Sequence, residues 1–328
     1  MTTLITGAGL VGSLAAARLL AEGDEQPVLY DVAFSMENLA ERLPLDRVTL
    51  VRGDVNDVPD LVRAIQTHGV DRVIHTAGFL TWMVRERPYA GVRVNLVGLL
   101  SVLEAARLTA VDRVVFCSSS TVYLGLKTPP PSGRLEEDFT LRAVREHPPS
   151  VYASMKLAGE WLGHNYREEY GVECASVRFA GVFGPWRGTP SGGPSQLMKN
   201  LIESAWRGQP CRLSSGALNT AAIDYVYAAD AAQGAVRAAL APRPESWVYN
   251  IGMGAVYKVP EIIALVERAT GRKLELDVYE AKSPSGYTDD SYPSDLSRAR
   301  AELGYDPEYP METAIRDYLG WLDRQGAR

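Results

Sequence analysis

A tyrosine and a lysine four residues apart form the first pair in this sequence that could do acid–base chemistry. Tyr152 and Lys156 stand in the run Tyr-Ala-Ser-Met-Lys, and residues at this spacing share one face of a helix. A phenol with a pKa of about 10 is a poor acid or base at neutral pH, but a nearby ammonium favours the phenolate and lowers that pKa. The pair predicts a tunable proton donor and acceptor, although an ordinary exposed helix can carry the same pair by chance.

A run of hydroxyl side chains precedes this pair. Ser119 and Ser120 follow an apolar stretch at 113–118 that is typical of a β-strand. The carboxyl ends of strands in a doubly wound sheet form the edge where such sheets bind ligands. The run could orient a substrate oxygen there, but serine runs are also common in loops without any function.

Near the start of the chain, a glycine-rich turn has the spacing G-x-G-x-x-G. The first glycine permits a tight turn, the second allows a pyrophosphate to approach the backbone, and the third allows a helix to pack closely on a strand. The turn follows a predicted strand at 2–6 and opens a predicted helix, whose amino terminus attracts phosphates. Alone the motif is weak. The predicted cofactor contacts are Gly7, Gly9, Leu10, Val11 and Gly12.

Two acidic residues at predicted strand ends strengthen the case for a dinucleotide. Asp31 lies about 20 residues beyond the last glycine, where a carboxylate can bind the hydroxyl groups of the adenosine ribose. Val32 to Phe34 offer no cation for a 2′-phosphate, which favours NAD over NADP. Asp54 could bind the adenine amino group while Val55 packs on the ring. Ordinary turn residues are the alternative for both aspartates.

These residues need a scaffold, and the hydrophobic pattern predicts an α/β fold. Apolar runs predict six strands at 2–6, 27–31, 47–52, 71–75, 113–118 and 173–178. Amphipathic segments alternate with them at 10–22, 36–42, 57–68, 88–109 and 151–170, as in βαβ units. We expect a Rossmann-type doubly wound parallel sheet over residues 1–178. Residues 179–328 then form a smaller mixed α/β substrate region, partly interleaved with the first, with helices near 195–207, 228–240, 258–271, 295–303 and 311–324. The proline-rich stretch 119–150 is expected to be a loop over the site.

Composition excludes several other classes of protein. The 328 residues carry a net charge of −6 without a basic run, which argues against nucleic-acid and acidic membrane partners. No apolar stretch reaches the roughly 18 residues of a membrane span, and the amino terminus lacks a signal-peptide pattern. We therefore expect a cytoplasmic protein. Three separated cysteines and four histidines predict neither a disulfide framework nor a metal site.

The order of these motifs resembles the extended short-chain dehydrogenase/reductase family, which includes NAD-dependent sugar epimerases and dehydratases. A glycine turn, an acidic strand end, a serine-bearing strand end and Tyr-x-x-x-Lys follow one another as they do in that family. The resemblance covers nearly the whole chain. It extends to 75–78 (His-Thr-Ala-Gly), 94–98 (Val-Asn-Leu-Val-Gly), 118–123 (Ser-Ser-x-x-Val-Tyr), 178–185, 224–230 and 249–252.

The resemblance implies specific roles. Tyr152 relays the proton, Lys156 lowers its pKa and binds the nicotinamide ribose, and Ser119 orients the reacting oxygen while hydride moves between a carbinol carbon and NAD. It further implies that the helices 88–109 and 151–170 pair with those of a second subunit, giving a homodimer. The remaining predicted cofactor contacts are Ala77, Gly78 and Asn95. The predicted contacts to a small-molecule substrate are Phe79, Thr81, Trp82, Ser120, Arg178, Gly181, Phe183 and Trp186.

The sequence departs from the family pattern where the substrate should bind. Ile223 replaces an arginine that pairs with the diphosphate of a nucleotide sugar, and Gly181 replaces an asparagine. An apolar side chain cannot neutralise a phosphate, although Arg187, Arg212 or Arg298 could compensate.

Three functions remain open at this point. The main prediction is an NAD-dependent dehydrogenase or reductase that acts at a secondary alcohol or ketone of a sugar or a related polyhydroxylated molecule, and Ile223 favours a substrate without a nucleotide. A sugar epimerase with retained NAD and a catalytically silent NAD sensor are the alternatives. The segments 79–87, 179–193 and 280–295 would shape the substrate pocket.

Overall fold

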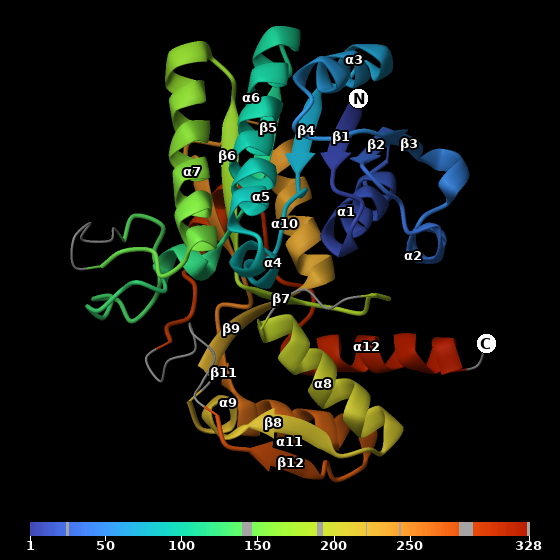
Figure 1. The fold of residues 1–328 in the computed structure, drawn as a ribbon, viewed down its shortest axis with the longest axis vertical. Coiled ribbons are helices and arrows are strands. Elements are labelled where there is room, and N and C mark those ends of the chain that lie inside the picture. Colours follow the sequence, from blue (N-terminus) through green and yellow to red (C-terminus); the bar gives the residue numbers. More distant parts are fainter. Residues whose placement is uncertain are drawn as a thin grey trace.

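A seven-stranded parallel sheet forms the centre of the molecule (Figure 1), with the strand order β10-β6-β5-β4-β1-β2-β3. The computed structural model describes residues 1–23, 26–139, 146–188, 193–220, 222–242, 244–281 and 291–326. The direction of the strand order reverses beside β1, which is where doubly wound sheets bind ligands. The strands are β1 (Thr2–Thr6), β2 (Gln26–Asp31), β3 (Thr49–Arg52), β4 (Arg72–His75), β5 (Arg113–Ser119), β6 (Cys174–Phe179) and β10 (Val248–Ile251).

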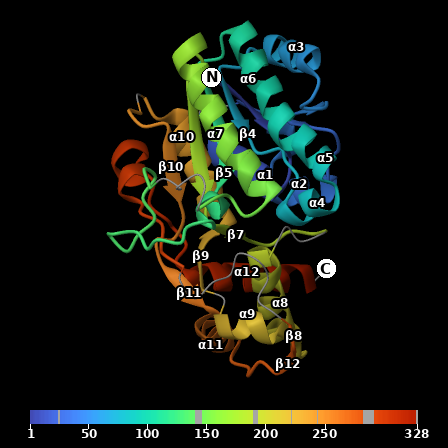
Figure 2. The same ribbon diagram turned by 60° about the vertical axis from the view of Figure 1, so that its left-hand side comes forward.

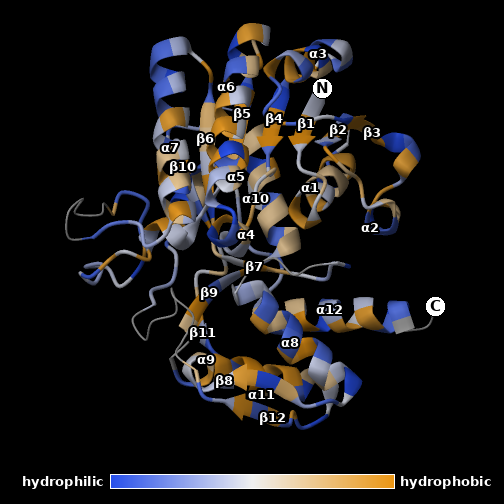
Figure 3. Cartoon of the chain, viewed as in Figure 1, coloured by the Kyte–Doolittle hydropathy of each residue, from blue (hydrophilic) through white to orange (hydrophobic). Residues whose placement is uncertain are grey.

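Helices cover both faces of this sheet because its strands are apolar on both sides (Figure 3). On one face, α1 (Leu10–Ala21) packs against α10 (Ala228–Leu240). The other face carries α3 (Val58–His68), α6 (Gly98–Thr109) and α7 (Val151–Tyr170). Neighbouring strand residues face opposite sides, so Leu4 and Ile5 of β1 belong to different hydrophobic clusters.

The second half of the chain contributes to the central sheet and also builds a smaller layer below it (Figure 2). Its strand β10 pairs with β6, and α10 packs on β5 and β6. A third hydrophobic cluster holds the smaller layer together. The elements of that layer are β7 (Gly181–Phe183), α8 (Gly193–Arg207), β8 (Cys211–Ser214), α9 (Ser215–Thr220), β9 (Ala222–Tyr227), β11 (Val256–Lys258), α11 (Val259–Thr270), β12 (Leu276–Tyr279) and α12 (Met311–Gly326).

All six strands predicted from the apolar runs are present, and a seventh comes from the second half of the chain. This arrangement agrees with an interleaved organisation, while the domain boundary at residue 178 stays a prediction. The segment 79–87, for which no helix was predicted, contains the helix α4 (Thr81–Glu86) directly after β4. Shorter helical pieces are α2 (Met36–Arg42), α5 (Pro88–Val92), a π-helix (Arg93–Val97), 3-10 helices (Leu45–Arg47 and Ser120–Tyr123) and a second π-helix (Ala299–Leu303).

The helical stretch Pro88–Thr109 corrects one expectation. By length and composition it is apolar enough to cross a bilayer, whereas no stretch of the sequence was expected to be. Half of its apolar part is buried inside the protein, where the stretch packs on α3, α7 and β5. This packing is that of a core helix.

Candidate active site

A cavity of about 850 Å³ opens at the carboxyl edge of the sheet, between the sheet and the smaller layer. It joins the glycine turn, the acidic strand ends, the serine run and the Tyr-x-x-x-Lys pair in one space. The predicted site residues that line it are Gly7, Gly9, Leu10, Val11, Gly12, Asp31, Asp54, Val55, Ala77, Gly78, Phe79, Thr81, Trp82, Ser119, Ser120, Tyr152, Lys156, Gly181 and Trp186.

The glycine turn has the form of a cradle for a pyrophosphate. Gly7 has a φ of +90°, and a Cβ there would lie 2.7 Å from the Ala77 nitrogen. A Cβ on Gly12 would lie 1.9 Å from the Gly7 carbonyl oxygen, so a side chain at either position would displace the backbone. A Cβ on Gly9 would meet nothing within 4 Å. The middle glycine therefore faces open space at the amino terminus of α1, where phosphates bind favourably.

Asp31 is held at the end of β2 by backbone donors. Its Oδ2 accepts a hydrogen bond of 2.7 Å from the Ala8 amide, and its Oδ1 accepts one of 3.1 Å from the Ala33 amide. Asp54 lies at the end of the neighbouring strand, where its Oδ1 accepts from the Asn56 amide at 2.9 Å. Both carboxylates line the end of the cavity that is farthest along the sheet from Tyr152. This arrangement fits the adenosine half of NAD.

The acid–base residues meet where β5 ends beside α7. Lys156 is buried, and its Nζ donates a hydrogen bond of 2.6 Å to the Cys117 carbonyl oxygen. The same Nζ lies 5.6 Å from the centre of the Tyr152 ring and 4.8 Å from that of Phe116. Tyr152 shares a hydrogen bond with Ser119. Strand β5 and helix α7 thus place the three predicted catalytic side chains together.

Burial dominates the proton affinities at this place. Loss of water around the phenol raises the pKa of Tyr152 to about 12, and the hydrogen bond with Ser119 opposes that rise. Burial also lowers the pKa of Lys156 to about 8, against the pull of Cys117 and Glu160. Lys156 is expected to lower the pKa of Tyr152, but burial of the phenol raises this pKa by more in the folded protein. A positive charge brought into the cavity would favour the phenolate.

Asn95 does not line the cavity, although it is predicted as a cofactor contact. It lies in the π-helix Arg93–Val97, and its side-chain amide bonds both the main-chain NH and the main-chain carbonyl of Phe79. The Phe79 amide donates to Asn95 Oδ1 at 2.6 Å, and Asn95 Nδ2 donates to the Phe79 carbonyl oxygen at 2.8 Å. Phe79 lines the cavity, so Asn95 positions this part of the cavity wall without lining the cavity itself.

Arg178 is placed differently from its predicted role in substrate binding. It is buried in β6 and forms an ion pair with Glu160 of α7 at 2.6 Å. Its Nη1 donates to the Tyr123 hydroxyl at 2.5 Å and to the Glu137 carbonyl oxygen at 3.0 Å. These three partners are buried, so Arg178 connects the segment at Glu137 to the sheet. Arg178 does not line the cavity.

Phe183 is likewise absent from the cavity lining. It is fully buried and packs edge-on against Tyr225 and Tyr227. The alternation along β7 explains the difference, because Val182 lines the cavity and its neighbour Phe183 faces the opposite side. Phe183 therefore belongs to the core of the smaller layer.

The substrate end of the cavity contains contacts that the sequence did not single out. Ser195 and Lys199 of α8 line it, together with Tyr318 of α12. The glycine and proline residues that precede α8 signal a helix start, but nothing in the sequence shows that this helix faces the sheet. Residues 189–192 and 282–290, which belong to segments expected to shape the pocket, lie outside the described part of the chain.

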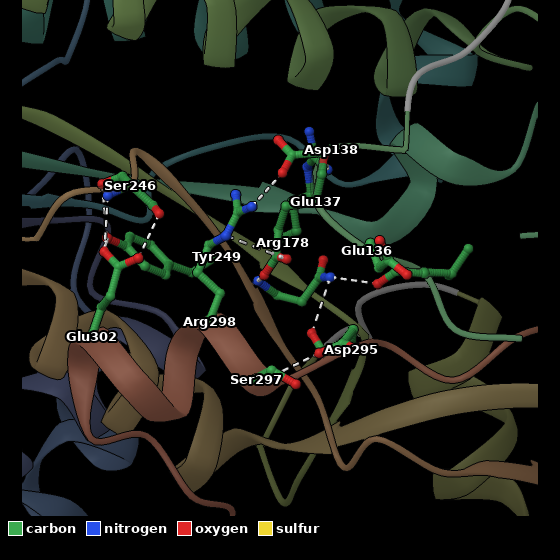
Figure 4. Close-up of polar contacts among 12 residues, drawn as sticks. Glu136, Glu137, Asp138, Arg178, Ser246, Tyr249, Asp295, Ser297, Arg298 and Glu302 are labelled. Carbon is green, nitrogen blue, oxygen red and sulfur yellow. Dashed lines mark hydrogen bonds and ion pairs between the residues drawn. The ribbon is translucent and has the colours of Figure 1, made fainter. Parts of the chain in front are cut away.

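Ile223 lines the cavity, as its place in the motif predicts. The three arginines that could compensate for it have other contacts. Arg187 pairs with Glu41 at 2.6 Å, and Arg298 pairs with Asp138, as Figure 4 shows for the second pair. Arg212 lies over the ring of Tyr279. In the part of the chain that the structure describes, these arginines do not line the cavity.

Comparisons with known proteins agree with this geometry. The chain is 29% identical to UDP-glucuronate 4-epimerase 4 of Arabidopsis thaliana, over 98% of this chain and 75% of the relative. It is 27% identical to the UDP-glucuronate 4-epimerase of Thermodesulfobacterium geofontis, over 97% of this chain and 95% of the relative.

Solved structures agree as well. The UDP-glucose 4-epimerase of Thermus thermophilus, in complex with NAD, matches with a TM-score of 0.78 and 27% identity over 98% of both chains. The UDP-glucuronic acid 4-epimerase of Bacillus cereus, in complex with UDP-glucuronic acid and NAD, matches with a TM-score of 0.81 and 25% identity, over 99% of this chain and 100% of the other.

The model of the NAD dependent epimerase/dehydratase family matches residues 3–252. This match spans the glycine turn, the Tyr-x-x-x-Lys pair and the strand β10 that completes the central sheet. The prediction of an extended short-chain dehydrogenase/reductase with a Rossmann-type fold is confirmed, and so are the predictions of NAD as cofactor and of an enzyme. The chain belongs to the NAD dependent epimerase/dehydratase family and is an NAD-dependent enzyme of the extended short-chain type.

Proposed function

We propose that this chain is a sugar 4-epimerase that acts on a nucleotide sugar and keeps its NAD through the catalytic cycle. This proposal reverses the order of the two predictions from sequence, in which a dehydrogenase came first. The main support for this proposal is that Ser119, Tyr152 and Lys156 line the same cavity as the glycine turn predicted to hold the cofactor. The relatives named as 4-epimerases support it.

The chain's own residues account for the acid–base part of the reaction. Tyr152 takes the proton of the substrate hydroxyl and later returns it, while Ser119 holds the same oxygen by a hydrogen bond. The buried ammonium of Lys156, 5.6 Å from the centre of the Tyr152 ring, favours the phenolate of Tyr152 and would bind the hydroxyls of the nicotinamide ribose. When bound, NAD would supply the hydride chemistry at the carbinol carbon, and the cavity that holds Ser119 and Tyr152 would keep that carbon beside it. Asp31 and the glycine turn anchor the adenosine and pyrophosphate portions.

The diphosphate of a nucleotide sugar would lie against the start of α8 in this proposal. Ser195 and Lys199 line that end of the cavity and offer a hydroxyl and an ammonium group. Lys199 is only loosely paired, with its Nζ 3.8 Å from the Glu203 carboxylate. It can therefore supply the positive charge that Ile223 lacks.

Ile223 also favours a second candidate function. An apolar residue at the position of the phosphate-pairing arginine suits a sugar without a diphosphate, and net dehydrogenation of such a sugar releases NADH. The catalytic residues would act in the same way. The two functions differ in the substrate and in the fate of the cofactor.

One experiment separates them. The purified chain is incubated with UDP-glucuronate, UDP-glucose and the corresponding free sugars, while products are identified by NMR and NADH is followed by its absorbance. The proposal expects a 4-epimer of a UDP-sugar without net formation of NADH. Stoichiometric NADH with a free sugar, and no turnover of either UDP-sugar, would favour the dehydrogenase instead.

A further inference from the structure

The segment that leaves β7 crosses the cofactor end of the cavity and is fastened on its far side. We call residues Gly184 to Arg187 the crossing segment. It runs from β7 below α1 toward α2, between the sheet and α12 (Figures 1 and 2). Gly184 and Trp186 line the same cavity as Leu10 and Asp31. A Cβ on Gly184 would lie 2.8 Å from Ala228 Cβ of α10 and 3.5 Å from Leu10 Cδ2, so the segment lies against the first residues of both α10 and α1.

Side chains of helix α2 form hydrogen bonds with the main chain of the crossing segment. The Arg187 amide donates to Asn38 Oδ1 at 3.1 Å, and Asn38 Nδ2 donates to the Arg187 carbonyl oxygen at 3.1 Å. The Nη2 of Arg42 donates to the Pro185 carbonyl oxygen at 2.6 Å. The Arg42 guanidinium also lies 5.1 Å from the centre of the Trp186 ring. Hydrogen bonds from a charged, buried donor are stronger than those between neutral groups.

The carboxylate of Glu41 joins these contacts to the smaller layer. It forms an ion pair with Arg187 at 2.6 Å and accepts a hydrogen bond from Gln325 of α12 at the same distance. The Trp321 indole of α12 donates to its second oxygen at 3.3 Å. The side chains of Glu41 and Arg42 are only 10% and 9% exposed. Helix α2, the crossing segment and α12 are thus connected by partly dehydrated charges, which solvent screens weakly.

We propose that the crossing segment is a strap that retains NAD, so that the cofactor leaves only after the contacts of Asn38 and Arg42 with this segment break. The geometry places the strap against the start of α1, where the pyrophosphate is cradled. This assigns Trp186 to the cofactor wall of the cavity, whereas the sequence suggested a contact to the substrate. An epimerase benefits because it needs no cofactor exchange between turnovers, whereas a dehydrogenase must release NADH each time.

The test measures NAD release without any sugar present, so it does not depend on the proposed reaction. The chain is loaded with radiolabelled NAD and diluted into excess unlabelled NAD. Asn38→Ala and Arg42→Met should each release label at least about tenfold faster, since each removes one or more hydrogen bonds from the segment. Arg316→Met is the matched control, because it removes an exposed ion pair with Glu312 and should stay within about twofold. Unchanged release in folded variants would overturn the proposal.

A measurement on the unaltered chain covers the case in which a variant does not fold. Hydrogen exchange at the Arg187 amide reports directly on the bond to Asn38. If the strap must open before NAD leaves, bound NAD should slow exchange at this amide by at least about tenfold. Equal exchange with and without NAD would overturn the proposal.

Discussion

Tyr152 is the residue expected to transfer the proton of the substrate hydroxyl. Its side chain lines the cavity, where dehydration raises the pKa to about 12 and Ser119 opposes the rise. The neighbouring ammonium of Lys156 is held by the Cys117 carbonyl oxygen and is therefore fixed in place. A phenol in this setting keeps its proton until positive charge enters the cavity. Proton transfer is thereby coupled to the presence of the oxidised cofactor, whose nicotinamide ring would carry a positive charge.

Replacing this phenol gives the first prediction. Tyr152→Phe removes the hydroxyl that accepts and returns the proton, so turnover should fall by at least about a hundredfold while NAD stays bound. Turnover is measured with the best substrate found, and NAD is measured after denaturation of the purified protein. Tyr170→Phe, at an exposed position of α7, is the control and should leave turnover unchanged. Normal turnover of Tyr152→Phe would remove this residue from the mechanism.

His75 gives a prediction about pH. The ring is buried at the end of β4, with Nδ1 bonded to the Thr6 hydroxyl at 2.7 Å, and burial lowers its pKa to about 3, with the Lys156 charge adding to the effect. The unfolded chain binds a proton near pH 6.5, so acidification below that value favours unfolding. The free energy of unfolding should fall by up to about 1.4 kcal/mol per pH unit from this group alone.

Urea unfolding at neutral pH and at two lower pH values, down to about pH 5, checks this dependence below the pKa of the unfolded chain. His75→Asn has no titrating ring and should lose stability less steeply than the unaltered chain over this range. The opposite result, the same pH slope in both proteins, would show that other groups cause the acid sensitivity.

At the scale of elements, the Arg178–Glu160 pair connects β6 to α7. Arg178→Met leaves the Glu160 carboxylate buried without its cation, which typically costs about 3 to 5 kcal/mol. The double variant Glu160→Leu with Arg178→Met removes both charges and should recover much of that loss. Thermal and urea unfolding measure the difference. Equal losses in the single and double variants would mean that the pair does not act as a unit.

The sequence predicts most strands and helices of the sheet, but it does not predict which side chains of different elements meet. Apolar runs identify the strands β1 to β6, most of which are buried on both faces, and the glycine turn identifies the start of α1. The same reasoning missed α4, a six-residue helix too short for a clear period. It also placed Arg178 in the substrate site, because a sequence does not show that a glutamate on α7 will face an arginine on β6. Contacts from Ser195 and Lys199 depend on how the two halves of the chain meet, which local patterns do not contain.

The homodimer of the whole molecule stays a prediction, and its expected interface is formed by the helices 88–109 and 151–170. Several large apolar side chains are exposed on or beside the helices expected to pair, among them Val97 at 41% and Leu108 at 54%. Val97→Glu with Leu108→Glu would place charges in the expected interface and should give a monomer. Val278→Glu, on the distant strand β12 and 43% exposed, should leave the mass unchanged. Light scattering measures the mass, and a monomeric unaltered chain at micromolar concentration would contradict the prediction.

Both halves of the chain build the whole-molecule site. The sheet and its helices α1 and α7 supply the cradle and the acid–base residues, and the smaller layer lines the other side of the cavity. In this cavity, hydride taken from the sugar should return to the same sugar. The most direct test uses a UDP-sugar that carries deuterium at C4, with excess unlabelled NADH in solution. We predict that the 4-epimer forms and keeps its deuterium at C4. Loss of the label to water or to the NADH pool would contradict hydride return within one site.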